Sequence, residues 1–131
     1  MELAELVGST GSLVGVDESA LYVDHLTRRA ADRGFDHVRV VLGDVQNLED
    51  GLRGVPQFDV AYMRWVLCFT KQPRRVIEGV ASLLRPGGRF IIQDYFNYLG
   101  CFTMAPRRES MKAVTDAITR SWAASGGDPD V

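Results

Sequence analysis

Short apolar runs alternate along the chain with longer stretches in which apolar residues recur at helical spacing. The runs are rich in β-branched and aromatic side chains, which is typical of buried strands in a parallel sheet. Apolar positions three and four apart between the runs predict amphipathic helices. Four strands are therefore expected, at Leu13–Val16, Val38–Leu42, Phe58–Met63 and Arg89–Gln93.

Turn and capping residues mark where the predicted helices begin and end. The strongest helix opens at Gln72-Pro73, because proline is tolerated in the first turn, and stops at Arg85–Gly88. Another helix, of about fourteen residues by typical helix lengths, is expected between Ser19 as its N-cap and Gly34 beyond its end. Further helical stretches are predicted at Glu2–Val7, Gln46–Leu52 and Glu109–Ala124.

Strands that alternate with helices imply right-handed crossovers and a parallel sheet. We therefore predict the α/β fold class. With 131 residues, the chain is expected to form a single domain. Its stretch Asp94–Pro106 is aromatic and turn-rich, which is typical of a lid or a substrate-facing loop.

Each predicted strand runs directly into a polar group. Asp17, Asp44 and Asp94 follow three of the strands, and Arg64 follows the remaining one. A charge at the edge of a core needs hydrogen-bond partners or a ligand, and an open parallel sheet binds its ligands outside the carboxyl ends of its strands. We therefore expect these four side chains to converge on one crevice.

Composition and charge narrow the classes of function. The chain has 46% hydrophobic and 24% charged residues and a formal net charge of −2, as is usual for a soluble globular protein. It has no long basic run, so neither nucleic acid nor a membrane is expected as a partner. The N-terminal MELAELVG lacks a secretory pattern, so the cytoplasm is the default location.

The spacing of cysteine and histidine argues against a metal centre. Cys68 and Cys101 lie far apart in the sequence, and His25 and His37 form no H-x-x-x-H pattern. These spacings match no common zinc motif. No metal site is predicted.

Four blocks of sequence follow one another in a familiar order: GVDES (Gly15–Ser19), GDVQNL (Gly43–Leu48), FDVAYMRWVL (Phe58–Leu67) and LLRPGGRFIIQDY (Leu83–Tyr95). Together they resemble the class I S-adenosylmethionine-dependent methyltransferases, in particular the small-molecule group related to quinone-biosynthesis enzymes. The resemblance implies a Rossmann-like parallel sheet flanked by helices. It also implies S-adenosyl-L-methionine as the cofactor and methyl transfer to a small-molecule acceptor.

The resemblance implies five cofactor-binding positions. Asp17 would accept hydrogen bonds from both ribose hydroxyls, since a carboxylate offers two oxygens to a vicinal diol, and Glu18 would lie beside it. Asp44 would accept from the adenine amino group, while the N–H of Val45 would face the ring. Arg64 would lie near the methionine half of the cofactor.

Methyl transfer from a sulfonium ion needs little acid or base catalysis. The leaving group is neutral, so alignment of nucleophile, methyl group and sulfur carries much of the rate. No catalytic residue is therefore predicted. If the acceptor must lose a proton, Tyr95, Tyr98 and Asp94 are the candidates to assist.

The chain departs from the family pattern at both ends. The family's glycine-rich loop and its first strand are missing before Met1, and its C-terminal hairpin is missing after the last helix. Because the missing strand is the middle of the family's sheet, Leu13–Val16 and Phe58–Met63 are expected either to pair directly or to leave the sheet gapped. Residues 1–131 are interpreted as a truncated, partial methyltransferase domain, whose open sheet edges would favour self-association.

Structural roles remain open for the same residues. Asp17 could cap a helix in competition with Ser19, and Asp44 could stabilise a turn. Arg64 could form an ion pair with Asp59 or Asp94. Packing is favoured over a substrate cage for Trp65, Phe69, Tyr95 and Tyr98.

Two other functions remain as alternatives. A nicotinamide-dependent oxidoreductase would also bind a ribose through an acidic residue after the second strand of its fold. However, no G-x-G-x-x-G precedes Asp17 and no Tyr-x-x-x-Lys occurs in the chain. The other alternative is a non-catalytic remnant that acts, if at all, as a binding module.

Overall fold

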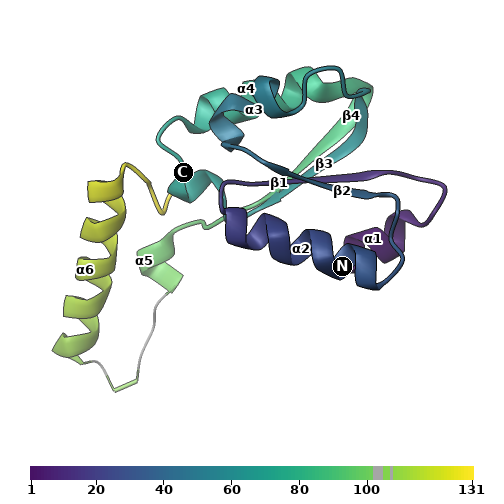
Figure 1. Cartoon of the computed structure of the whole chain (residues 1–131). Coiled ribbons are helices and arrows are strands. Elements are labelled where there is room, and N and C mark those ends of the chain that lie inside the picture. The colour runs from purple at the N-terminus through teal and green to yellow at the C-terminus, as the bar shows by residue number, and fades with distance from the viewer. Residues whose placement is uncertain (102–104, 107) are drawn as a thin grey trace. The chain divides into compact units, whose positions relative to one another are not determined.

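A computed structural model of the protein describes residues 1–101, 105–106 and 108–131. The chain folds into two compact units, Met1–Val55 and Pro56–Val131 (Figure 1). Residues 102–104 of the predicted loop Asp94–Pro106 lie outside the described part.

The first unit contains a two-stranded parallel sheet connected by a helix. Strand β1 (Leu13–Asp17) pairs with β2 (Val38–Leu42), and Asp17 faces Leu42 at the carboxyl end. Helix α2 (Ala20–Asp32) joins the two strands and contacts both of them. This is the predicted strand–helix–strand crossover.

Short helices precede and follow this crossover. Helix α1 (Glu2–Val7) matches its predicted bounds. The predicted turn after β2 is a 3-10 helix, η1 (Val45–Asn47), continued by α3 (Leu48–Gly51). The local pattern therefore located every element of this unit.

Helix α2 ends where its glycine predicts. Gly34 has a φ of 67°, a conformation that residues with a Cβ rarely adopt. This turn lets the N–H of Phe35 donate to the carbonyl of Ala30 (2.9 Å). The last carbonyls of the helix thereby gain a donor, as in a glycine-terminated C-cap.

The second unit contains the other parallel pair. Strand β3 (Phe58–Arg64) pairs with β4 (Leu84–Gln93), and α4 (Pro73–Leu83) connects them. The 3-10 helix η2 (Leu67–Phe69) lies between β3 and α4 and contacts α4. Each strand thus pairs with the other strand of its own unit, in two sheets, and the α/β class with parallel pairing is confirmed.

Strand β4 begins earlier than the sequence indicated. Phe58 pairs with Leu84 and Val60 with Arg89, so Arg85–Gly88 form a bulge inside the strand. The predicted stop was correct for the helix, but the proline and glycines interrupt the strand instead of preceding it. Leu84, predicted as the last member of the helical stripe, is therefore the first residue of β4.

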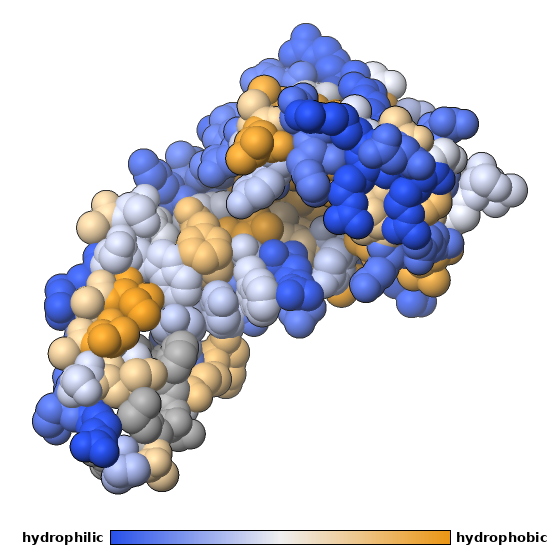
Figure 2. Space-filling view, turned by 60° about the horizontal axis from the view of Figure 1, so that its bottom comes forward, coloured by the Kyte–Doolittle hydropathy of each residue, from blue (hydrophilic) through white to orange (hydrophobic). Residues whose placement is uncertain are grey.

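The last described elements are helical. Helix α5 (Tyr98–Cys101) follows β4, and α6 (Glu109–Ser125) extends one residue beyond its prediction. Apolar side chains remain on the molecular surface, as Figure 2 shows in orange. On α6, Val114 and Ile118 are exposed.

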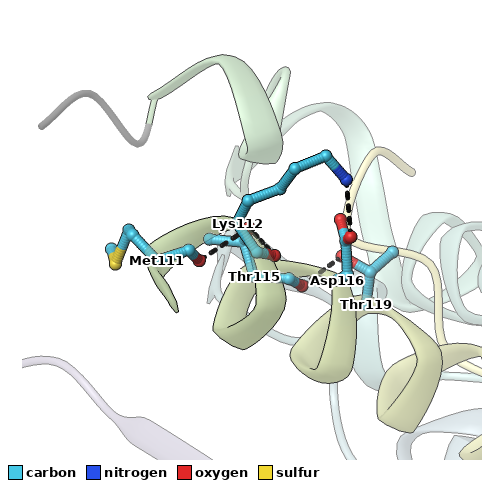
Figure 3. A network of polar contacts seen from close by, with 5 residues as sticks. All are labelled: Met111, Lys112, Thr115, Asp116 and Thr119. Atoms are coloured by element: carbon cyan, nitrogen blue, oxygen red, sulfur yellow. Dashed lines mark hydrogen bonds and ion pairs between the residues drawn. The ribbon is translucent and has the colours of Figure 1, made fainter. Parts of the chain in front are cut away.

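Two threonine hydroxyls of α6 donate hydrogen bonds within the helix (Figure 3). Thr115 donates from its Oγ1 to the carbonyls of Met111 (3.2 Å) and Lys112 (2.9 Å), and Thr119 donates to the carbonyl of Thr115 (2.9 Å). Lys112 lies 2.7 Å from Asp116, and this carboxylate raises the pKa of Lys112. These contacts stabilise the helix itself.

Two neighbouring apolar residues on α4 differ in how far they are buried in the second unit. Val76 on α4 is fully buried, whereas Ile77, its neighbour, is 40% exposed. Val76→Ala should lower the free energy of unfolding by about 2 kcal/mol, from lost burial and the cavity left behind. Ile77→Ala should cost less than about half as much. Equal costs in denaturant unfolding would contradict this assignment of the core.

Candidate functional site

Two carboxylates lie at the carboxyl end of the first unit's sheet. Asp17 is the last residue of β1, and Asp44 follows shortly after the end of β2. The N–H of Gly43 donates to the main-chain carbonyl of Asp17 (3.0 Å), which extends the pairing as far as the residue before Asp44. The structure therefore brings two predicted cofactor ligands to one edge of one sheet.

Asp17 uses one carboxylate oxygen for its own turn. Its Oδ1 accepts the N–H of Ser19 (2.8 Å), an arrangement that fixes the chain ahead of α2. Ser19 occupies the N-cap position but its side chain makes no capping bond. In the part of the chain that the structure describes, no hydrogen bond reaches Oδ2 of the half-buried Asp17, so this oxygen keeps its capacity to accept.

Both carboxylate oxygens of Asp44 accept hydrogen bonds, in contrast to those of Asp17. Its Oδ1 accepts the main-chain N–H of Gln46 (2.8 Å), which caps η1. The side-chain amides of Gln46 (3.3 Å) and Asn47 (3.2 Å) also donate to its two oxygens. The structural alternative, a turn carboxylate, therefore describes the contacts that Asp44 makes here, and a ligand would have to share or displace them.

The remaining predicted ligands of the first unit lie beside these two aspartates. Glu18 follows Asp17 and is exposed, and Val45 follows Asp44 and is half-buried at the start of η1. Four of the five predicted cofactor-binding residues thus lie at one end of the first unit. Arg64, the fifth, belongs to the second unit.

Arg64 ends β3 and lies against the next residue. Its guanidinium carbon is 4.1 Å from the centre of the Trp65 ring, within the usual cation–π range. Neither ion pair that was an alternative for Arg64 is formed: Asp59 pairs with Arg85 (2.7 Å), and Asp94 accepts main-chain N–H groups.

The chain turns sharply after β3. The N–H of Trp65 donates to the carbonyl of Gln93 (2.9 Å), which adds one more rung to the ladder. Trp65 then adopts a φ of 52°, a left-handed conformation that is strained for a bulky side chain. This turn sends the next three main-chain N–H groups towards the end of β4.

Asp94 receives those groups. Its Oδ2 accepts from the N–H of Val66 (3.2 Å), Leu67 (2.9 Å) and Cys68 (3.4 Å). Its Oδ1 accepts the N–H of Tyr95 (2.9 Å). One carboxylate therefore joins the segment after β3 to the end of β4. The sequence placed Asp94 at a strand end but did not predict that main-chain N–H groups of another segment would donate hydrogen bonds to it.

Cys68 lies beside this carboxylate and is fully buried. Burial raises the pKa of its thiol to about 12, and the hydrogen bond to Asp94 and the charge of that carboxylate add to the effect. The thiol is thus held in its protonated form. A buried, protonated thiol is a packing group and a weak nucleophile.

Aromatic rings surround the same turn. Trp65 stacks on Tyr95 with ring centres 5.7 Å apart, and Tyr95 meets Tyr98 edge-on at 5.1 Å. Trp122 from α6 contacts Tyr98 at 4.8 Å and Phe69 at 5.1 Å. These mutual contacts agree with the packing role favoured for the aromatic residues. Packing agrees with the apolar side of the predicted helix Glu109–Ala124, to which Trp122 belongs, but the sequence did not predict which rings Trp122 would contact.

The end of the chain attaches to this cluster. The N–H of Asp128 donates to the carbonyl of Cys68 (2.9 Å), and the N–H of Tyr98 donates to Oδ1 of Asp130 (2.6 Å). A Cβ at Gly127 would clash with the main-chain carbonyl oxygen of Cys68, so only glycine allows this approach. The tail therefore holds α5 and η2 together.

Comparison with known proteins identifies the family. A family model described as a methyltransferase domain matches residues 1–125. The chain belongs to this methyltransferase family. The resemblance to class I S-adenosylmethionine-dependent methyltransferases is thereby confirmed, and the chemistry general to that family is methyl transfer from this cofactor.

Curated relatives carry related names. An arsenite methyltransferase of Aquipseudomonas alcaligenes is 31% identical over 72% of this chain and 28% of its own length. Methyltransferase str2 of Strobilurus tenacellus is 32% identical over 55% of this chain and 26% of its own length. The chain thus spans about a quarter of the length of the curated relatives that it matches.

A solved structure agrees at the level of the fold. The CcbJ methyltransferase from Streptomyces caelestis superposes with a TM-score of 0.62 at 22% identity, over 78% of this chain and 40% of its own.

Over residues 1–101, 105–106 and 108–131, no helix has the length and hydrophobicity needed to cross a bilayer. The same residues contain no group of three or more metal-ligating side chains.

The buried thiol gives a testable dependence on pH. The folded state favours protonated Cys68, so the stability it contributes is complete below its ordinary pKa of 9.0 and is lost as the pH rises towards 12. Between about pH 8 and about pH 10.5, wild type should lose more of its free energy of unfolding than Cys68→Ala. Cys101→Ala, which removes the exposed thiol, should behave as wild type. Identical losses in all three proteins would contradict the burial of Cys68.

Proposed function

We propose that this chain is part of a methyltransferase that transfers the methyl group of S-adenosyl-L-methionine to a small molecule. The observation that carries the proposal is the Asp17 carboxylate, which ends β1 with one oxygen that retains accepting capacity. It lies in a chain that the methyltransferase family model matches almost throughout. That model runs across both units, which supports treating residues 1–131 as part of one domain.

The proposed cofactor site uses residues that end strands. Asp17 would bind the ribose diol through its available oxygen, with Glu18 beside it. Asp44 would accept from the adenine amino group after exchange of one side-chain amide donor, and Val45 would present its N–H to the ring. Arg64 would lie near the methionine half, where its guanidinium attracts a carboxylate.

The chemistry demands orientation more than proton transfer. The bound cofactor supplies an activated methyl group, and the protein residues hold donor and acceptor in line. Tyr95, Tyr98 and Asp94 remain the candidates to take a proton from the acceptor. Asp94 is the weakest of them, because both of its oxygens already accept main-chain N–H groups.

The acceptor is proposed to be a small molecule. The name of one relative, the arsenite methyltransferase of Aquipseudomonas alcaligenes, supports this class, because arsenite is a small molecule. A cytoplasmic location is part of the proposal, because both cysteines are free thiols as is usual in a reducing compartment. Self-association through open strand edges stays a prediction.

Calorimetric titration of the purified chain tests the proposal. S-adenosylmethionine and S-adenosylhomocysteine should bind saturably, and NAD should not. Asp17→Asn replaces one ribose-accepting oxygen with a donor, so it should weaken both ligands about tenfold or more. Asp24→Asn, which removes only an exposed ion pair with Arg28, should bind as wild type.

Three outcomes would contradict the proposal. If Asp17→Asn and wild type bind S-adenosylmethionine and S-adenosylhomocysteine with equal affinity, Asp17 does not contact the cofactor. Binding of NAD in preference to S-adenosylmethionine and S-adenosylhomocysteine would favour the oxidoreductase alternative. If a cooperatively folded chain binds none of the three, the binding-module alternative describes it instead.

A further inference from the structure

The strongest unexplained feature is the strained turn after β3. Trp65 adopts a left-handed φ of 52°, a conformation that is unfavourable for a bulky side chain and persists only where surrounding contacts enforce it. Nothing in the proposed methyl transfer demands this conformation by itself. The contacts that hold it therefore indicate what the turn is for.

Those contacts converge on Asp94. A single oxygen, Oδ2, accepts the N–H groups of the three residues that follow Trp65, and the nearest is that of Leu67 at 2.9 Å. Successive N–H groups that point at one anion form a nest, which binds negative charge strongly. On the other side of the turn, the N–H of Trp65 is fixed by the carbonyl of Gln93 (2.9 Å). Trp65 is thus held between the last residue of β4 and the residue that follows it.

Two other side chains lie against the Trp65 ring. The guanidinium of Arg64 lies 4.1 Å from the centre of the indole ring. The ring of Tyr95 stacks on the same indole, almost parallel, at 5.7 Å. Tyr95 is also tied to Asp94 directly, since its N–H donates to Oδ1 (2.9 Å).

We propose that Asp94 is a positioning residue that holds Trp65 in its left-handed conformation and thereby orients the Arg64 guanidinium at the end of β3. The consequence for ligand binding rests on the proposed function, in which Arg64 contacts the methionine half of the cofactor. The geometric part of the proposal concerns Asp94, Trp65 and Arg64 alone.

The role requires a carboxylate. All four main-chain groups that face the two oxygens are donors, so both ends of the side chain must accept. Asparagine has the same shape but only one accepting end. Whichever way its amide turns, Asp94→Asn directs an NH₂ group at a main-chain N–H.

Fluorescence of a single tryptophan tests the geometry. The chain has two tryptophans, so Trp122→Phe leaves Trp65 as the only reporter and keeps an aromatic ring on α6. In this background, Asp94→Asn should shift Trp65 emission to longer wavelength and increase its quenching by acrylamide, because the indole leaves Arg64 and Tyr95. Asp59→Asn, which breaks only the exposed pair with Arg85, should leave both properties unchanged.

Unchanged Trp65 fluorescence in a folded Asp94→Asn protein would overturn the proposal. Equal changes in Asp94→Asn and Asp59→Asn would overturn it too, because the effect would not be specific to Asp94. If Asp94→Asn gives no cooperative thermal melt, Asp94→Glu carries the same measurement. Glutamate keeps two accepting oxygens but displaces them by one methylene group, so a smaller shift in the same direction is expected.

Cofactor affinity separates this proposal from the proposed function. Asp94→Asn should weaken S-adenosylhomocysteine about tenfold, and Asp59→Asn should not. If fluorescence changes as expected but the wild-type chain binds neither S-adenosylmethionine nor S-adenosylhomocysteine, the positioning role stands and the proposed function fails. If wild type binds and Asp94→Asn binds equally well, the link from Asp94 through Arg64 to the ligand is overturned.

Discussion

Main-chain N–H groups beyond the end of a strand need acceptors, and three aspartates supply them in this chain. Asp17 accepts from Ser19 and Asp44 from Gln46, each within its own turn. Asp94 accepts from three residues of a different segment as well as from Tyr95. Because an unsatisfied buried amide costs more than a hydrogen bond returns, these carboxylates fix the loops in which a ligand site has to be built.

The three carboxylates differ in the accepting capacity that remains. Asp44 and Asp94 receive donors on both oxygens, whereas Asp17, in the described part of the chain, receives a main-chain donor from its own turn on Oδ1 alone. A single aspartate can therefore cap a turn and still bind a hydroxyl group, so the structural and the ligand-binding roles of Asp17 do not exclude each other. Asp94 has the opposite character. Its contacts organise the turn that carries Trp65 and Arg64, which suits a residue that acts through its neighbours.

Much of this fold follows from local pattern. The strands, the aspartates at their ends and the glycine after α2 are specified by short stretches of sequence, and the structure confirms them. The bulge at Arg85–Gly88 was missed because a Pro-Gly-Gly stretch ends a helix equally well whether the strand starts before or after it. The amides on Asp94 and the ring of Trp122 come from distant segments, and no local periodicity encodes such contacts.

The proposed cofactor site consists of residues that end strands. Amide NMR spectra of the ¹⁵N-labelled chain, recorded as S-adenosylhomocysteine is added, test this proposal. We expect saturable shifts for Asp17, Glu18 and Val45 in one unit and for Trp65 in the other, with α1 unaffected. Saturable shifts confined to other residues, or no shifts in a well-dispersed spectrum, would contradict it.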